Sequence, residues 1–184
     1  MIRVVVSLLL PILAFGVGQQ DSQLIEQNHF CVECSIEHPV PLPPAALKTL
    51  QGTNDKNGEH NELERCAKED GISVRDIPEP WFVASETTLK KGEAPGLVVQ
   101  ANNACLWGAH IGPFWLLAGS NAGYRLLFAG RADGFDVLEH VTNGYPDIEL
   151  VFLLQAGSFI GHSKFCYKDG NYQLCGKRTE QNPL

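Results

Sequence analysis

The sequence predicts a mainly β protein of the α+β class, with two short helices followed by an antiparallel arrangement of eight strands. From Trp81 onward, short runs rich in Val, Leu, Phe and Tyr recur about every 10 to 14 residues. Asn-Gly and Asp-Gly pairs between the runs supply the positive φ that tight hairpins need. No helical period fits between the runs, so antiparallel pairing is expected. A sandwich of two four-stranded sheets is favoured, and a closed, barrel-like meander is the alternative.

Residues 1–18 are typical of a secretory signal peptide. Arg3 is followed by an apolar run that ends in small residues. A membrane anchor is the alternative, but the run is barely long enough to cross a bilayer core of about 30 Å, and Ser7 and Pro11 interrupt it. We therefore expect a secreted or periplasmic protein with no transmembrane anchor after signal cleavage.

Two segments are expected between the signal peptide and the strands. Residues 19–44 form a Cys/Pro-rich segment, and residues 45–80 form a short helical region. Pro44 suits the first turn of one helix. Asn61 is a candidate N-cap for a second helix, which Gly71 would end.

The β domain is expected over residues 81–175, followed by a polar tail at residues 176–184. Its predicted strands are 81–89, 96–101, 114–119, 124–129, 135–141, 147–154, 162–168 and 171–175.

The six cysteines favour disulfides, because their number is even and the chain is expected to be exported. We predict a Cys166–Cys175 bridge across the last hairpin. A two-residue loop at Gly170-Asn171 would place these cysteines directly opposite each other. A loop at Asp169-Gly170 would leave them diagonal, about 7 Å apart and beyond comfortable reach.

Cys31 and Cys34 are predicted to be structural disulfide cysteines, with two alternatives. His29, Cys31, Cys34 and His38 have the spacing of a tetrahedral zinc site. The Cys-x-x-Cys motif is also found in redox-active sites. Neither a metal nor another cofactor is expected.

The loop at residues 105–113 differs from the other turns because it is long and carries Trp107 and His110. Aromatic side chains on a loop held by a rigid sheet are a common means of recognition. Tyr145, in the last tight turn but one, is a third candidate binding residue. Common hydrolase, zinc-protease and nucleotide-binding motifs are absent, so no catalytic residue is assigned. With 21 acidic against 14 basic residues, nucleic-acid binding is disfavoured.

Five motifs in the β region resemble those of a group of secreted bacterial β domains of uncharacterised function. The resemblance covers roughly residues 81–173, implies a β fold and implies no known activity. Periplasmic lysozyme inhibitors are an analogy of compartment and general appearance only. The motifs are CLWGAHIGPFW, GYRLLF, Val137-Leu138, TNGYPDI and YKDGNYQ.

These observations favour an exported protein without catalytic activity that binds another protein or an envelope component, with inhibition of a cell-wall hydrolase as one such role. A ligand- or metal-binding secreted module is the second hypothesis, and an envelope hydrolase is the third. A pocket with converging carboxylates would favour the hydrolase, whereas a flat face with exposed aromatic residues would favour the binding protein.

Overall fold

The computed structural model describes residues 27–52 and 59–183, and in them nine strands form two antiparallel sheets. The predicted sandwich is confirmed, but its sheets have five and four strands where two four-stranded sheets were expected, and they form no closed barrel. The predicted signal peptide lies outside the described residues. None of the described helices is both long and apolar enough to cross a membrane.

Each sheet has a simple strand order. The five-stranded sheet contains, in order, β1 (His29–Cys31), β6 (Gly134–Thr142), β7 (Tyr145–Leu154), β8 (Phe159–Lys168) and β9 (Asn171–Gln181). The four-stranded sheet contains β2 (Phe82–Thr87), β3 (Gly96–Ala101), β4 (Gly112–Ser120) and β5 (Gly123–Ala132).

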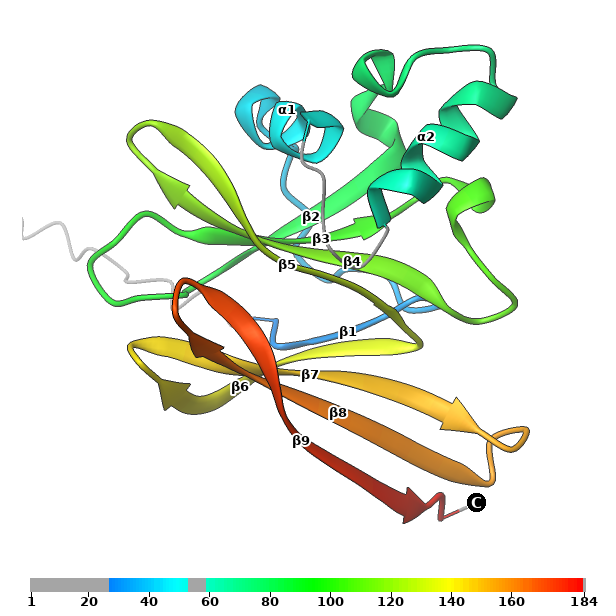
Figure 1. Ribbon diagram of the computed structural model, residues 1–184, viewed down its shortest axis with the longest axis vertical. Coiled ribbons are helices and arrows are strands. Elements are labelled where there is room, and N and C mark those ends of the chain that lie inside the picture. The colour runs from blue at the N-terminus through cyan, green and yellow to red at the C-terminus, as the bar shows by residue number, and fades with distance from the viewer. Residues whose placement is uncertain (1–26, 53–58, 184) are drawn as a thin grey trace, which may run out of the picture.

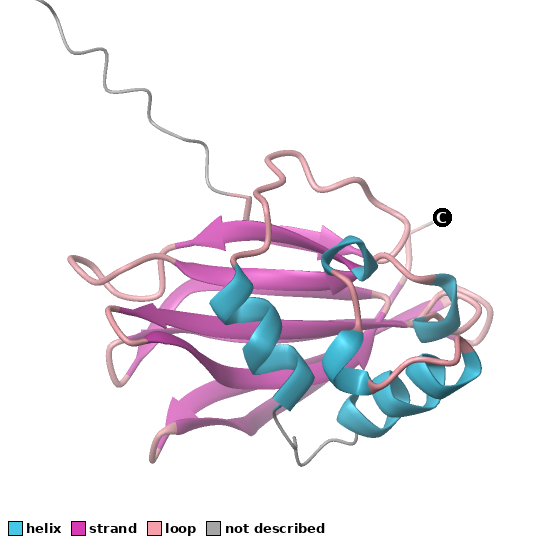
Figure 2. Ribbon diagram, turned by 90° about the horizontal axis from the view of Figure 1, so that it is seen from above, coloured by secondary structure: helices cyan, strands magenta, loops and turns pink. Residues whose placement is uncertain are grey.

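The helices lie on one face of the four-stranded sheet, and the five-stranded sheet lies on its other face (Figure 1). They are α1 (Pro44–Gly52), α2 (Glu59–Glu69) and the 3-10 turns η1 (Val74–Asp76), η2 (Glu79–Trp81) and η3 (Ala104–Leu106). Figure 2 shows α1 and α2 in front of the strands when the molecule is seen from the helical side.

The second helix ends where the sequence predicted but begins earlier. At Gly71 the backbone takes a φ of +72°, and the Ile72 N–H donates to the Ala67 carbonyl oxygen. The helix starts at Glu59, so Asn61 lies inside it rather than at its N-cap.

Side chains of β4 alternate between two cores. Phe114 and Leu116 pack between the sheets, whereas Trp115 and Leu117 pack against the helical layer. Both Phe114 and Trp115 are buried, because the helices cover the second face of the sheet.

Two of the predicted hairpin turns form as expected, and a third does not. Asn143-Gly144 and Asp169-Gly170 take positive φ at both residues, as tight hairpins require. At Asp133-Gly134 the chain instead crosses from the four-stranded to the five-stranded sheet. The Asp133 N–H donates to the Val151 carbonyl oxygen, and the Asp133 carbonyl accepts from Val32, so this corner is fixed by backbone bonds.

The five-stranded sheet extends beyond the predicted β domain in both directions. β1 comes from the Cys/Pro-rich segment, and its Phe30 is buried beside Phe135. β9 continues to Gln181, so most of the expected polar tail is strand paired with β8.

Three disulfides are formed: Cys31–Cys34, Cys66–Cys105 and Cys166–Cys175. The Cys166–Cys175 bridge is confirmed, but the reason we gave for it is wrong. The loop is Asp169-Gly170, and a β-bulge in β9 makes Cys175 the extra residue between two ladder pairs. The bulge brings the two Cα atoms to 5.8 Å, within disulfide reach.

Candidate binding site at the Cys31–Cys34 end of the sandwich

A cavity of about 340 Å³ lies at the end of the molecule where β1 finishes and the chain crosses between the sheets. We call it the β1 cavity. Four segments supply its walls: β1 with the turn after it, the loop before β4, the Asp133-Gly134 corner, and the end of β7. The residues are His29, Cys31, Glu33, His110, Asp133, Gly134, Val151 and Leu153.

Gly134 leaves room within the β1 cavity. A Cβ atom at this position would lie 3.2 Å from the Phe30 carbonyl oxygen and 3.4 Å from the Val151 Cβ. Gly134 also stands directly between Cys31 and Val151 in the strand register. A larger side chain would therefore fill the space between β1 and β7.

Two histidines of the cavity are held by carboxylates. The His29 Nδ1 lies 2.5 Å from an Asp136 carboxylate oxygen, and the His110 Nδ1 contacts Oδ1 of Asp133. The other oxygen of Asp133 accepts the Leu153 N–H at 2.9 Å, and this carboxylate is only 10% exposed. Because a carboxylate accepts, Nδ1 of each ring is the donor, which leaves Nε2 as the nitrogen available to a ligand.

A second cavity, of about 610 Å³, lies on the other side of the Cys31–Cys34 turn. Cys34, Gln100 and Trp107 are among its lining residues. The Gln100 Nε2 donates to the Cys31 carbonyl at 3.0 Å, which ties the turn to β3. Trp107 is 40% exposed, and its indole N–H donates to the Ala101 carbonyl at 3.1 Å. The Cys31–Cys34 turn therefore lies between the two cavities, and the Gln100 hydrogen bond fixes its position.

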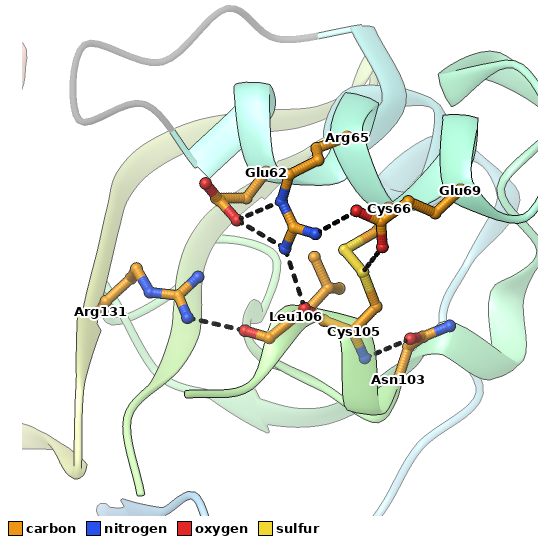
Figure 3. The surroundings of a disulfide bond; sticks show 8 residues. All are labelled: Glu62, Arg65, Cys66, Glu69, Asn103, Cys105, Leu106 and Arg131. Atoms are coloured by element: carbon orange, nitrogen blue, oxygen red, sulfur yellow. Dashed lines mark hydrogen bonds and ion pairs between the residues drawn. A yellow bond between two sulfur atoms is a disulfide. The ribbon is translucent and has the colours of Figure 1, made fainter. Parts of the chain in front are cut away.

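The loop that carries Trp107 and His110 is anchored at its base (Figure 3). The Cys66–Cys105 bridge joins α2 to η3. Arg65, held by two glutamates of α2, donates to the Cys105 carbonyl at 3.2 Å. Arg131 of β5 donates to the Leu106 carbonyl at 2.8 Å. These contacts fix the backbone on which the two candidate side chains are placed.

Five of the candidate residues from the sequence meet at this end of the molecule. His29 and Cys31 line the β1 cavity with His110, while Cys34 and Trp107 line the second cavity. The sequence placed them in two unrelated segments, and the corner at Asp133 brings those segments together.

The remaining two candidates lie elsewhere. Tyr145 stacks on Tyr167 with ring centroids 4.0 Å apart, and both pack against the inter-sheet core. It lies at the far end of β6 and β7 from the Asp133 corner. His38 is exposed and is not among the residues that line either cavity.

The predicted Cys31–Cys34 disulfide is formed, and the four residues of the alternative zinc site are not assembled as a tetrahedral site. The Sγ atoms of Cys31 and Cys34 are bonded to each other, and His29 is bound to Asp136. Within the described ranges, the one cluster with ligand-type spacing is Cys66, Glu69 and Cys105, whose two cysteines form a disulfide.

Sequence reasoning missed the other residues of the β1 cavity. Asp133-Gly134 is predicted as one of the Asp-Gly hairpin turns, and Val151 and Leu153 lie in the predicted strand 147–154 without further distinction. Glu33 had no recognisable signal, since it becomes part of the cavity only when β1 pairs with β6.

An ionic cluster lies on the outer face of the five-stranded sheet, next to the β1 cavity, because Glu149 is directly opposite Asp136 in the strand register. Glu149 accepts two bonds from Arg178 and contacts His162 at 2.8 Å. Asp147 is fully buried and lies 2.8 Å from the Lys164 Nζ. Burial raises the pKa of Asp147, but hydrogen bonds from Lys164, Thr142 and His140 outweigh it, so the pKa is lowered overall. The charges of this cluster pair with one another, which favours a structural role.

Comparison with protein-family models, with curated proteins and with solved structures finds no match to this chain.

Proposed function

We propose that the protein is an exported, non-enzymatic binding protein that recognises a partner protein or envelope component through its Cys31–Cys34 end, and that a cell-wall hydrolase is the partner class to test first. The observation that supports it most is the meeting of β1, the disulfide turn and the Trp107–His110 loop around two hollows. Loops placed on a rigid sheet are a common basis for recognition.

The groups around the β1 cavity suit binding better than catalysis. Both oxygens of Asp133 are engaged, by His110 and by the Leu153 N–H. Cys31 is in a disulfide and is not a free nucleophile. Among the residues that line the cavity, Glu33 is the other carboxylate. Most glycoside hydrolases use two carboxyl groups that exchange protons, and the residues that line this cavity do not offer such a pair.

Export is supported by two features. Three disulfides form within the described residues, as is typical of proteins folded in an oxidising compartment. The sequence also predicts a signal peptide at residues 1–18. A partner in the envelope or outside the cell is consistent with both.

Capture from envelope extract tests the proposal when it is made with matched surface variants. Leu153 lines the β1 cavity and is 44% exposed, whereas Leu174 lies on β9 and is 50% exposed. We expect Leu153→Lys to lose a captured protein that wild type and Leu174→Lys both retain. The captured protein, purified, is then titrated calorimetrically against all three forms.

A second assay tests whether the protein itself hydrolyses the cell wall. The protein is incubated with purified peptidoglycan, with and without lysozyme, and release of soluble fragments is measured. Release by the protein alone that His110→Gln abolishes would overturn the proposal in favour of an envelope hydrolase. Equal capture by wild type and Leu153→Lys would contradict the assignment of this surface.

A further inference from the structure

We infer that the β1 cavity binds a cationic side chain of the partner, in particular an arginine guanidinium. This inference rests on the proposed function, because it names the chemistry of the group that the partner would insert. It follows from the charge of the walls, the state of the two imidazoles and the apolar part of the lining.

The walls of the cavity carry negative charge. Glu33 and Asp133 line it, and Asp136 lies behind His29. Neither lysine nor arginine is among the lining residues. Charges of one sign in a concave site with low-dielectric walls concentrate the field there. A cation therefore gains electrostatic energy in this cavity that an anion would not.

The two imidazoles present acceptors when they are neutral. Since Nδ1 of His29 and of His110 donates to a carboxylate, Nε2 carries the free lone pair. A guanidinium has five N–H donors in a plane and accepts nothing. We expect its N–H groups to donate hydrogen bonds to Nε2 of His29, to Nε2 of His110 and to the Glu33 carboxylate.

The apolar lining suits the alkyl part of such a side chain. Val151 and Leu153 of β7 line the same cavity, as does Cys31. Long cationic side chains bury their methylene groups along apolar surface while the charged end reaches polar partners. The volume of about 340 Å³ lies at the lower end of the range for ligand pockets, which suits one side chain.

A bound metal ion explains the same residues less well. The ligand atoms of His29, Glu33 and His110 do not lie close enough together to form a cluster with coordination spacing. A cation that is larger than a metal ion and donates several hydrogen bonds fits groups spread around a cavity.

The test uses the whole folded protein and a single-residue probe. Nα-acetyl-arginine amide is titrated into the 15N-labelled protein at millimolar concentrations, and Nα-acetyl-citrulline amide, its uncharged isostere, is the control ligand. We expect shifts in the amide signals of the cavity residues with the arginine probe, and binding about tenfold weaker or more with citrulline.

A matched pair of variants locates the contact. Glu33→Gln removes a wall charge on an exposed turn, and Glu86→Gln removes an exposed charge from β2. Only the first is expected to weaken arginine binding, by about tenfold. Equal binding of arginine and citrulline, equal effects of the two variants, or zinc binding that displaces the arginine probe would each overturn the inference.

The two proposals can fail separately. If the captured partner binds equally well to wild type and Glu33→Gln, and excess arginine amide does not compete with it, the cation inference fails and the binding function stands. If arginine binds as expected but no protein is captured, the cavity chemistry stands and the partner proposal fails.

Discussion

Among the residues that the structure describes, the buried carboxylates Asp147 and Glu149 are each paired with a cation and a histidine, and Asp147 is the clearest case. Its side chain is fully buried beside Lys164 and His140, at 2.8 and 2.6 Å. Its pKa is lowered in the folded state, against the effect of burial, by hydrogen bonds from Lys164, Thr142 and His140. The folded protein therefore binds this proton less readily than the unfolded chain does.

Asp147→Asn should make stability less dependent on pH in acid. A group with a lowered folded pKa contributes stability above its unfolded pKa, at about 3.9, and loses it as the pH falls through the folded value. Urea unfolding is measured at a series of pH values below about 5. We expect wild type to lose stability more steeply than Asp147→Asn over this range.

The exposed turn residue Asp169 supplies the matched control, as Asp169→Asn. Asparagine tolerates the left-handed conformation that Asp169 adopts, with φ +50°. If the free energy of unfolding falls equally with decreasing pH in wild type and Asp147→Asn, then Asp147 contributes nothing to the pH dependence of stability.

At the scale of elements, β4 depends on a close approach of the loop before β3. A Cβ atom on Gly119 would lie 2.4 Å from the Pro95 carbonyl oxygen, and backbone cannot swing aside as a long side chain can. We expect Gly119→Ala to lower the free energy of unfolding by about 1–3 kcal/mol, the usual range for overpacking.

Gly52→Ala is the control for this substitution, because a Cβ at Gly52 would meet no atom within 4 Å. It should leave the urea midpoint nearly unchanged. A Gly119→Ala variant as stable as Gly52→Ala would mean that the loop before β3 moves away without cost.

Turn chemistry made much of this fold predictable. Asn143-Gly144 and Asp169-Gly170 specify their hairpins locally, through the φ values that their residues tolerate. β1 was missed because three residues carry too little pattern, and their partners lie more than a hundred positions later in the sequence. The end of β9 was missed because its side chains are mostly exposed, so no apolar alternation marks the strand.

The candidate site was predictable only in parts. Trp107 and His110 were identified from the length and composition of their loop, and His29 and Cys31 from their spacing. Nothing in the sequence indicated that Asp133 is a crossing point between sheets, since Asp-Gly is also a common hairpin turn. The cavity exists only because of that crossing.

At the scale of the whole molecule, residues 81–175 are not expected to fold alone. This fragment lacks β1, which covers Phe135, and the helices, which cover Trp115. It also ends before the second half of β9. Two exposed apolar surfaces and an unpaired edge of β8 would remain.

We expect the fragment to show no cooperative urea transition and to bind a hydrophobic dye, whereas residues 27–184 should unfold in one step. The longer piece is the control because it keeps every described element. A sharp transition and dispersed amide spectra for residues 81–175 would show that the β region is a domain in its own right.

The three disulfides also imply an order of maturation. Their cysteines are separated by 3, 9 and 39 residues, and short loops close more readily in an unfolded chain. Cys31–Cys34 and Cys166–Cys175 can therefore oxidise early, while Cys66 meets Cys105 efficiently only after α2 has docked. Quenching with an alkylating reagent during oxidative refolding should find these two thiols free for longest. The loop bearing Trp107 and His110 is anchored by that late bond, so a newly folded molecule would acquire its binding end last.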